Sequence, residues 1–230
     1  MRIIYIDIDT LRADHLGCGG YHRDTSPNID TVASEGINFR NVYASDVPCL
    51  PSRTALITGM FGIRNGVINH GGRAADLQPE GKDRGFFGRF SMRSWASVFY
   101  LAGWHTASIS SFPFRHGASW WNSGFMESMN LMRGFGGERA DQVVPGALDW
   151  LERRGKADDW FLHVHLWDPH TPYRTPEDYG NPFESDPVPS WHTEDVRLAS
   201  WDLSGPHSAQ EPWGFRPDEW GEPPLSLIHI

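Results

Sequence analysis

The segment IIYIDIDT, residues 3–10, carries the β-branched and aromatic side chains that are typical of a buried strand. Its apolar pattern ends at Asp9 and Thr10, so these polar residues are expected where the strand ends. In α/β proteins with parallel sheets, functional side chains gather at the carboxyl ends of the strands. The segment therefore predicts the first strand of such a sheet and one corner of its site.

Strand and helix signals alternate along the chain that follows. Ser26 is an expected N-cap, Pro27 suits the first helical turn, and Gly36 suits the end of the same helix. Further helices are predicted at residues 51–58, 95–102 and 143–155, and strands at residues 37–43, 104–110 and 160–166. This order predicts an α/β fold, a largely parallel sheet with helices on both faces.

Three polar clusters follow predicted strands. They are Asp9 with Thr10, Ser110 and Ser111 with Arg115 and His116 beyond them, and Asp168 with His170. Because parallel strands end at the same edge of a sheet, we expect these clusters to contribute to one site.

Composition excludes several classes of function. The net charge of −9 over 230 residues provides no general basic field for nucleic acid or for an anionic membrane surface. No apolar run approaches the roughly 18 residues of a membrane span, and the chain opens directly on its first strand without a visible signal peptide. These features predict a cytoplasmic protein. Two cysteines, Cys18 and Cys49, are too few for a disulfide framework.

The end of the chain differs from the rest in composition. Eleven of the seventeen prolines lie between residues 169 and 224, and no persuasive periodicity accompanies them. We therefore expect a domain at residues 1–180 and an irregular segment, rich in Pro and Trp, at residues 181–230.

The segment ASDVPCLPSRTALITG, residues 44–59, places Cys49 just before the predicted helix. Backbone N–H groups and the helix dipole favour an anion at that end, and Arg53 adds a cation one turn later. Two readings of Cys49 stay open at this point. It is either a buried structural cysteine or a thiolate nucleophile whose pKa the helix lowers.

A resemblance to a known family gives a third reading. The motif CLPSR, residues 49–53, followed by TALITG, resembles the Cys-x-Pro-Ser-Arg signature of the type I sulfatases in the alkaline phosphatase superfamily. The preceding block TLRADHLGCGGYHRDTSPNIDTVASEGINFRNVYAS is similar to that family's N-terminal block. The agreement is close over residues 2–72 and continues weakly to about residue 180.

The resemblance implies an unusual nucleophile. In this family the cysteine is oxidised to formylglycine by a formylglycine-generating enzyme, and the hydrated aldehyde provides a gem-diol. One hydroxyl attacks the sulfur of a sulfate ester, and the other loses its proton as sulfate leaves. A calcium ion, with Mg²⁺ or Mn²⁺ as alternatives, would bind the diol and the sulfate oxygens together. Cys49 would then be the precursor of the nucleophile and a metal ligand.

Three further residues take expected roles from the resemblance, and one position departs from it. Asp9 falls on the family's metal aspartate, and Arg53 corresponds to the arginine that holds the formylglycine. His170, in DPHTPY, matches a histidine that contacts the sulfate and assists the leaving oxygen. Thr10 departs from the second aspartate that many members have, which leaves one fewer anionic ligand.

The family's Gly-Lys-Trp-His segment is not preserved, so Arg115 and His116 are the candidates for its substrate-binding cation and histidine. Asp7 is an alternative metal ligand, but periodicity favours a partly buried strand residue. His163 and His165 alternate on a predicted strand, and we expect them to pack rather than to bind a metal.

No Asp-Asn-Gly or Asp-His-Gly sequence follows residue 180 to supply the family's later metal ligands. The resemblance therefore predicts the N-terminal part of a sulfatase catalytic domain, truncated at its C-terminus and inactive as these 230 residues alone. Two alternatives remain: a phosphonate or phosphate ester hydrolase of the same superfamily, and a non-catalytic fragment that binds a sulfated ligand.

Overall fold

The computed structural model describes residues 1–78, 94–131, 138–170, 177–180, 182–183, 185–187, 190 and 193–201. These residues form two compact units. The first unit contains Met1–Asp9 and Asn41–Trp167, and the second contains Thr10–Arg40 and Asp168–Ile230. The expected boundary between residues 180 and 181 stays a prediction.

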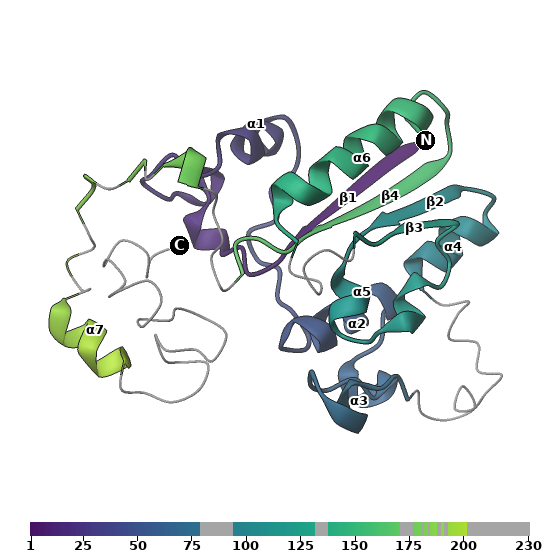
Figure 1. The fold of residues 1–230 in the computed structure, drawn as a ribbon, viewed down its shortest axis with the longest axis horizontal. Helices are drawn as coiled ribbons and strands as arrows, with labels where there is room; N and C mark the ends of the chain where they lie inside the picture. Colours follow the sequence, from purple (N-terminus) through teal and green to yellow (C-terminus); the bar gives the residue numbers. More distant parts are fainter. Residues whose placement is uncertain are drawn as a thin grey trace. The chain divides into compact units, whose positions relative to one another are not determined.

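The first unit is built on a parallel sheet of four strands (Figure 1). Strands β1 (Arg2–Ile8), β4 (Trp160–Leu166), β2 (His105–Ile109) and β3 (Glu127–Met129) are neighbours in that order. Every pair is parallel, with Asp7 opposite His165 and Ser108 opposite His163. The α/β prediction is confirmed, and the strands predicted around β1, β2 and β4 are present.

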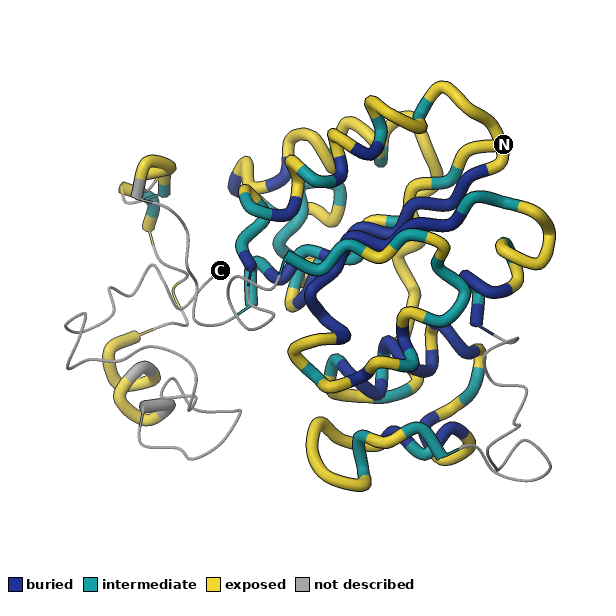
Figure 2. The backbone as a smooth tube through the Cα atoms, turned by 45° about the vertical axis from the view of Figure 1, so that its right-hand side comes forward, coloured by how far each residue is buried: buried dark blue, intermediate teal, exposed yellow. Residues whose placement is uncertain are grey.

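Helices cover both faces of this sheet, as Figure 1 shows. Helix α6 (Ala140–Arg154) covers one face, where Val143, Ala147 and Trp150 pack on the even-numbered side chains Leu162 and Val164 of β4. Each large apolar side chain that is fully buried in this way contributes about 1.5–3 kcal/mol. Strands β2 and β4 are buried along most of their length in Figure 2, which agrees with the nearly continuous apolar character of β4. Strand β1 is less buried than its composition predicted, since none of its residues is buried and Ile4 and Ile6 are exposed.

The opposite face packs against α2 (Cys49–Thr58), α4 (Trp95–Leu101) and α5 (Phe112–Arg115). Side chains alternate along a strand, so Phe161, His163 and His165 of β4 point to this face. Aromatic rings fill the layer: Trp95 meets Tyr5 edge-on at 4.5 Å and Phe161 at 5.1 Å between ring centroids. The shorter elements of this unit are α3 (Gly62–Asn65), η3 (Gly72–Ala75) and η6 (Ser119–Asn122).

The helix ends follow the expected local chemistry, but two helices start earlier in the sequence than predicted. Ser94 caps α4 by accepting a hydrogen bond from the Ser97 backbone, and Gly59 ends α2 at φ 63°. Helix α2 starts at Cys49 instead of residue 51, because Pro51 in the first turn gives up no intrahelical hydrogen bond. Helix α6 starts at Ala140 instead of residue 143, because Gln142 Oε1 accepts a hydrogen bond from the Arg139 backbone N–H at 3.0 Å; Pro145 lies inside the helix.

The strand predicted at residues 37–43 is wrong. These residues follow α1 (Pro27–Glu35) in irregular backbone, and Ile37, Phe39, Val42 and Tyr43 are 75–86 % exposed. An alternating pattern forms a strand only where another strand supplies its hydrogen bonds, and no described strand pairs with this segment.

The second unit has its own short elements. They are η1 (Ala13–His15), η2 (Gly17–Gly19), α1, η7 (Glu177–Tyr179) and α7 (Glu194–Trp201). The buried Arg23 joins its two chain segments through an ion pair with Asp186 at 3.1 Å. Within the described ranges, no helix has the length and apolar character needed to cross a membrane.

Candidate active site

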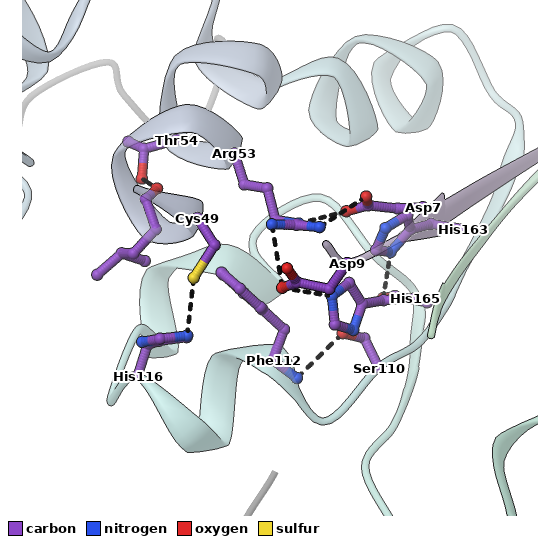
Figure 3. A network of polar contacts seen from close by, with 12 residues as sticks. Asp7, Asp9, Cys49, Arg53, Thr54, Ser110, Phe112, His116, His163 and His165 are labelled. Carbon is purple, nitrogen blue, oxygen red and sulfur yellow. Dashed lines mark hydrogen bonds and ion pairs between the residues drawn. The ribbon is translucent and has the colours of Figure 1, made fainter. Parts of the chain in front are cut away.

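Arg53 lies between two aspartates at the carboxyl end of β1 (Figure 3). Asp7 and Asp9 are two residues apart, so the pleat directs both toward α2. The Arg53 guanidinium donates from Nε to Asp7 Oδ2 at 2.5 Å and from Nη2 to Asp7 Oδ1 at 2.9 Å. Its Nη1 lies 3.3 Å from Asp9 Oδ2. The planar guanidinium therefore bridges both carboxylates in a fixed orientation.

Burial alone would lower the pKa of Arg53, whose side chain is only 10 % exposed. The hydrogen bonds to Asp7 and the charges of Asp7 and Asp9 outweigh that penalty, and the pKa is raised overall. A permanent positive charge thus stands one helical turn from Cys49.

Cys49 occupies the first turn of α2, and its side chain lies close to the nitrogen atoms of two histidines. Its Sγ lies 3.1 Å from His70 Nε2 and 3.7 Å from His116 Nε2. Burial, followed by the charge of Asp9, raises the pKa of the thiol to about 12, although Arg53 acts in the opposite direction. The side chain is therefore a neutral thiol at physiological pH, which argues against a conventional thiolate nucleophile.

His116 follows α5 and approaches Cys49 (Figure 3). Burial, followed by the charges of His70 and Arg115, lowers the pKa of His116 to about 3. The ring is consequently neutral near pH 7 and has one nitrogen that can accept a hydrogen bond.

Arg115, the other predicted substrate-binding residue, is exposed, and its guanidinium carbon lies 3.9 Å from the centre of the Trp167 ring. This cation–π contact holds the charge near the carboxyl end of β4. The structure therefore places Asp9, Cys49, Arg53, Arg115 and His116 in one unit, at the sheet edge that the strand order predicted.

His170 belongs to the second unit, as does Thr10. His170 follows the cis peptide bond between Asp168 and Pro169 and is partly buried. Its expected contact with a sulfate group stays a prediction.

Two histidines of β4 lie below the site and are fully buried, as expected for packing residues. His163 Nδ1 lies 3.0 Å from Ser108 Oγ, and burial lowers the pKa of His163 to about 3. His165 is closer to the site than expected, because its Nε2 lies 3.8 Å from Asp9 Oδ2.

The sequence interpretation missed His70 and the pairing of Asp7. His70 stands in INHGG within the block that resembles the family most closely, but no spacing rule connects it with Cys49, 21 residues away. Asp7 was weighed as a strand residue, and its two-residue spacing from Asp9 was the signal that both face one side.

The donor set for a metal is small in the described part of the chain. No group of three or more His, Cys, Asp or Glu side chains there could hold an ion. Asp9 offers the hard carboxylate oxygen that calcium prefers, and residue 49 lies beside it. These residues fit part of a calcium shell, and the remaining oxygens would have to come from elsewhere.

Comparison with known proteins identifies the family of this chain. The sequence model of the family described as Sulfatase matches residues 2–199. The chain belongs to the sulfatase family. It is 24 % identical over 203 residues to the uncharacterized sulfatase YidJ of Escherichia coli, a match that covers 76 % of this chain and 40 % of YidJ. This sulfatase-family chain therefore spans less than half the length of that relative.

Solved structures show the same fold. One, in complex with its substrate D-glucosamine-2-N,6-O-disulfate, superposes with a TM-score of 0.63 at 22 % identity and covers 82 % of this chain and 39 % of that one. The phosphonate monoester hydrolase of Agrobacterium radiobacter gives a TM-score of 0.64 at 18 % identity, over 86 % of this chain and 47 % of the hydrolase. The fold of this chain is thus shared with these two structures.

Proposed function

We propose that this chain carries the nucleophile end of a sulfuric ester hydrolase, with a formylglycine made from Cys49. The observation that carries the proposal is the setting of Cys49, a neutral thiol beside Arg53 and Asp9 at the start of a helix. A thiol whose pKa is about 12 is a poor nucleophile as it stands, whereas its surroundings suit a group that binds a tetrahedral anion. Membership of the sulfatase family supports conversion of this cysteine.

Each of several residues of this chain has its own role in the proposed reaction at residue 49. Arg53, locked by Asp7, fixes the first turn of α2 and offsets the negative charge of the ester. His116 is neutral and accepts a hydrogen bond from the side chain of residue 49. Arg115 supplies a cation for the substrate. The resemblance gives His170, in the second unit, the role of proton donor to the leaving oxygen.

Asp9 and residue 49 would hold the metal ion, for which we propose calcium, with Mg²⁺ or Mn²⁺ as alternatives. When bound, the ion supplies positive charge at the ester oxygens. The converting partner is a formylglycine-generating enzyme. Its substrate would be the segment CLPSR on the unfolded or nascent chain, because the folded chain buries most of Cys49, Pro51 and Arg53.

Conversion of Cys49 to formylglycine is tested by mass spectrometry. Mass analysis of the peptide that contains Cys49, from protein produced with a formylglycine-generating enzyme, should show the loss that accompanies conversion of the thiol to the aldehyde. The Cys18 peptide is the internal control and should keep its thiol mass. An unmodified Cys49 in every preparation would contradict the proposal and would favour the alternative of a non-catalytic fragment that binds sulfated ligands.

The alternative of a phosphonate or phosphate ester hydrolase shares the same nucleophile. Two observations favour considering it: the fold resembles that of a phosphonate monoester hydrolase, and Thr10 stands where many sulfatases have a second aspartate. Rates on paired aryl sulfate and aryl phosphonate esters, measured on one preparation of converted full-length protein, separate the two. We expect kcat/KM to be higher for the sulfate, and a higher value for the phosphonate would reverse the assignment.

Calcium binding by these 230 residues alone should be weak. Asp9 and residue 49 offer few oxygens to an ion that takes about 6 to 8, and water would supply the others without negative charge. Titration calorimetry of the 230-residue chain should detect no micromolar site. A micromolar site that Asp9→Asn leaves intact would show that other residues, with Asp168, Glu177 and Asp178 as first candidates, bind the ion.

A further inference from the structure

His70 contacts the nucleophile position and lies outside the site that the sequence predicted. Its Nε2 is 3.1 Å from Cys49 Sγ and accepts a hydrogen bond from the Leu50 backbone N–H at 3.4 Å. Because Nε2 accepts from an N–H group, a neutral ring carries its proton on Nδ1. The lone pair of Nε2 is therefore directed at the first turn of α2, where residue 49 lies.

The backbone around His70 is held by its own hydrogen bonds. The N–H groups of Ile68 and Asn69 both donate to the Ala74 carbonyl, at 2.8 and 3.0 Å, and the His70 N–H donates to Asn69 Oδ1 at 2.8 Å. Val67, which begins this loop, is fully buried. The histidine itself is exposed, so the contact with Cys49 does not result from packing His70 into a core.

A second acceptor faces the same side chain. His116 Nε2 lies 3.7 Å from Cys49 Sγ, and the rings of His70 and His116 are 5.0 Å apart between centroids. A thiol has one weak donor, which can serve only one of these nitrogens at a time. A hydrated aldehyde has two hydroxyl groups, and each of them donates one hydrogen bond. The two histidines therefore match the donors of a gem-diol better than those of a thiol.

We propose that His70 is a further catalytic residue of this site, whose Nε2 accepts a hydrogen bond from one hydroxyl of the hydrated residue 49 while His116 accepts from the other. This inference rests on the proposed function, since it requires formylglycine at position 49. Its consequence is that His70 stabilises the hydrate over the free aldehyde and fixes the orientation of the hydroxyl that attacks.

The first measurement reads the hydrate without any turnover. In the converted protein, oxime formation with hydroxylamine requires the free aldehyde, so its rate reports the aldehyde fraction. His70→Ala should raise this rate about fivefold, the effect of one lost hydrogen bond. His70→Gln, which can present an acceptor oxygen, should restore part of the wild-type rate. His22→Ala removes an exposed histidine of the second unit and is the matched control.

The second measurement separates catalysis from helix capping. If His70 acts on the nucleophile, His70→Ala in the converted full-length protein should lower kcat for an aryl sulfate about tenfold and leave KM nearly unchanged. If His70 only caps the Leu50 N–H, the variant should lose stability while the oxime rate and kcat per folded molecule stay at the wild-type values. That result would overturn the proposal.

A third measurement tests the contact between His70 and Cys49 separately from the conversion of Cys49 to formylglycine. In protein produced without conversion, Cys49 keeps its thiol, and His70→Ala should make its alkylation by iodoacetamide several-fold faster, because the ring covers Sγ. A rate within twofold of wild type would show that the contact is absent and overturn the proposal. If the contact is present but Cys49 is never converted, the proposed function fails, and the two-hydroxyl assignment fails with it.

Discussion

The two cysteines of this chain each lie near an aspartate, but the other groups around them differ. Cys18 is the middle residue of η2, and its N–H donates to Asp30 Oδ1 at 2.7 Å. Cys49 is the first residue of α2, with histidine nitrogens and Arg53 around it. The pKa of both thiols is raised, by desolvation first and by a nearby aspartate second. The thiol pKa therefore does not distinguish them, whereas the surrounding groups do.

The comparison teaches where an anion can bind. Next to Cys18, the carboxylate of Asp30 already accepts the hydrogen bonds of the Cys18 backbone and of Ser26, so a second anion would meet like charge. Next to Cys49, Arg53 and the first turn of α2 favour an anion, whereas the charge of Asp9 acts in the opposite direction. Matched substitutions in the two regions test this difference.

The largest effect is expected from the cysteines themselves. Cys49→Ala should lower aryl sulfate hydrolysis by about a thousandfold or more, since it removes the precursor of the nucleophile. Cys18→Ala should leave hydrolysis nearly unchanged. Both rates are measured on folded, converted full-length protein, with circular dichroism as the check on folding. Substantial turnover by a sequence-verified Cys49→Ala protein would refute the assignment of residue 49.

The second-largest effect on kcat is expected from substitution of the arginine near each cysteine. Arg53→Lys should lower kcat about a hundredfold, because lysine lacks the planar fork that bridges Asp7 and Asp9, and a displacement of about 1 Å can have that consequence. Arg40, which donates to the Cys18 carbonyl at 3.3 Å, is the control, and Arg40→Lys should leave kcat unchanged. Equal effects of the two changes would mean that Arg53 is only a background charge.

A smaller effect is expected from the aspartates. Asp7→Asn keeps the shape of the side chain but removes its charge and one of the two acceptors for Arg53, so kcat should fall about tenfold with little change in KM. Asp30→Asn should weaken the start of α1 and leave kcat intact, since Asp30 serves only the Cys18 region. A kcat for Asp7→Asn equal to wild type would show that the Arg53 orientation does not depend on Asp7.

Local patterns were sufficient to predict the frame of this site. The strand before Asp9, the helix that carries Arg53, and their meeting at one sheet edge follow from side-chain alternation, a proline near a helix start and the rule for parallel strands. These signals act within a few residues, or through one general feature of parallel sheets.

Features that depend on long-range partners could not be predicted in the same way. The segment at residues 37–43 alternates like a strand, but its conformation depends on a neighbour that local sequence does not specify. His70 reaches Cys49 only because residues 68–74 form a particular loop. The early start of α6 depends on the Gln142 side chain, which accepts a hydrogen bond from the Arg139 backbone N–H without the Ser or Thr that usually marks such a helix start.

The last prediction compares one histidine in each unit. It concerns how the free energy of unfolding depends on pH. His163 is fully buried in the first unit, and its pKa in the folded state is about 3, below the ordinary value of 6.5. Between those values the unfolded chain binds a proton that the folded chain does not, so stability falls as the pH is lowered through this window. One such group contributes a slope of up to about 1.4 kcal/mol per pH unit.

His163→Phe should reduce this slope, because phenylalanine fills the ring site beside Tyr5, Trp95 and Trp121 without titrating. The loss of the hydrogen bond with Ser108 lowers stability at every pH and therefore leaves the slope unaffected. Urea unfolding at pH 7, 6 and 5 measures the slope, and His22→Phe, at an exposed position of the second unit, should keep the wild-type value. If His163→Phe kept the wild-type slope as well, the acid sensitivity would have to come from other groups, with His116 the first candidate because its pKa is also lowered to about 3.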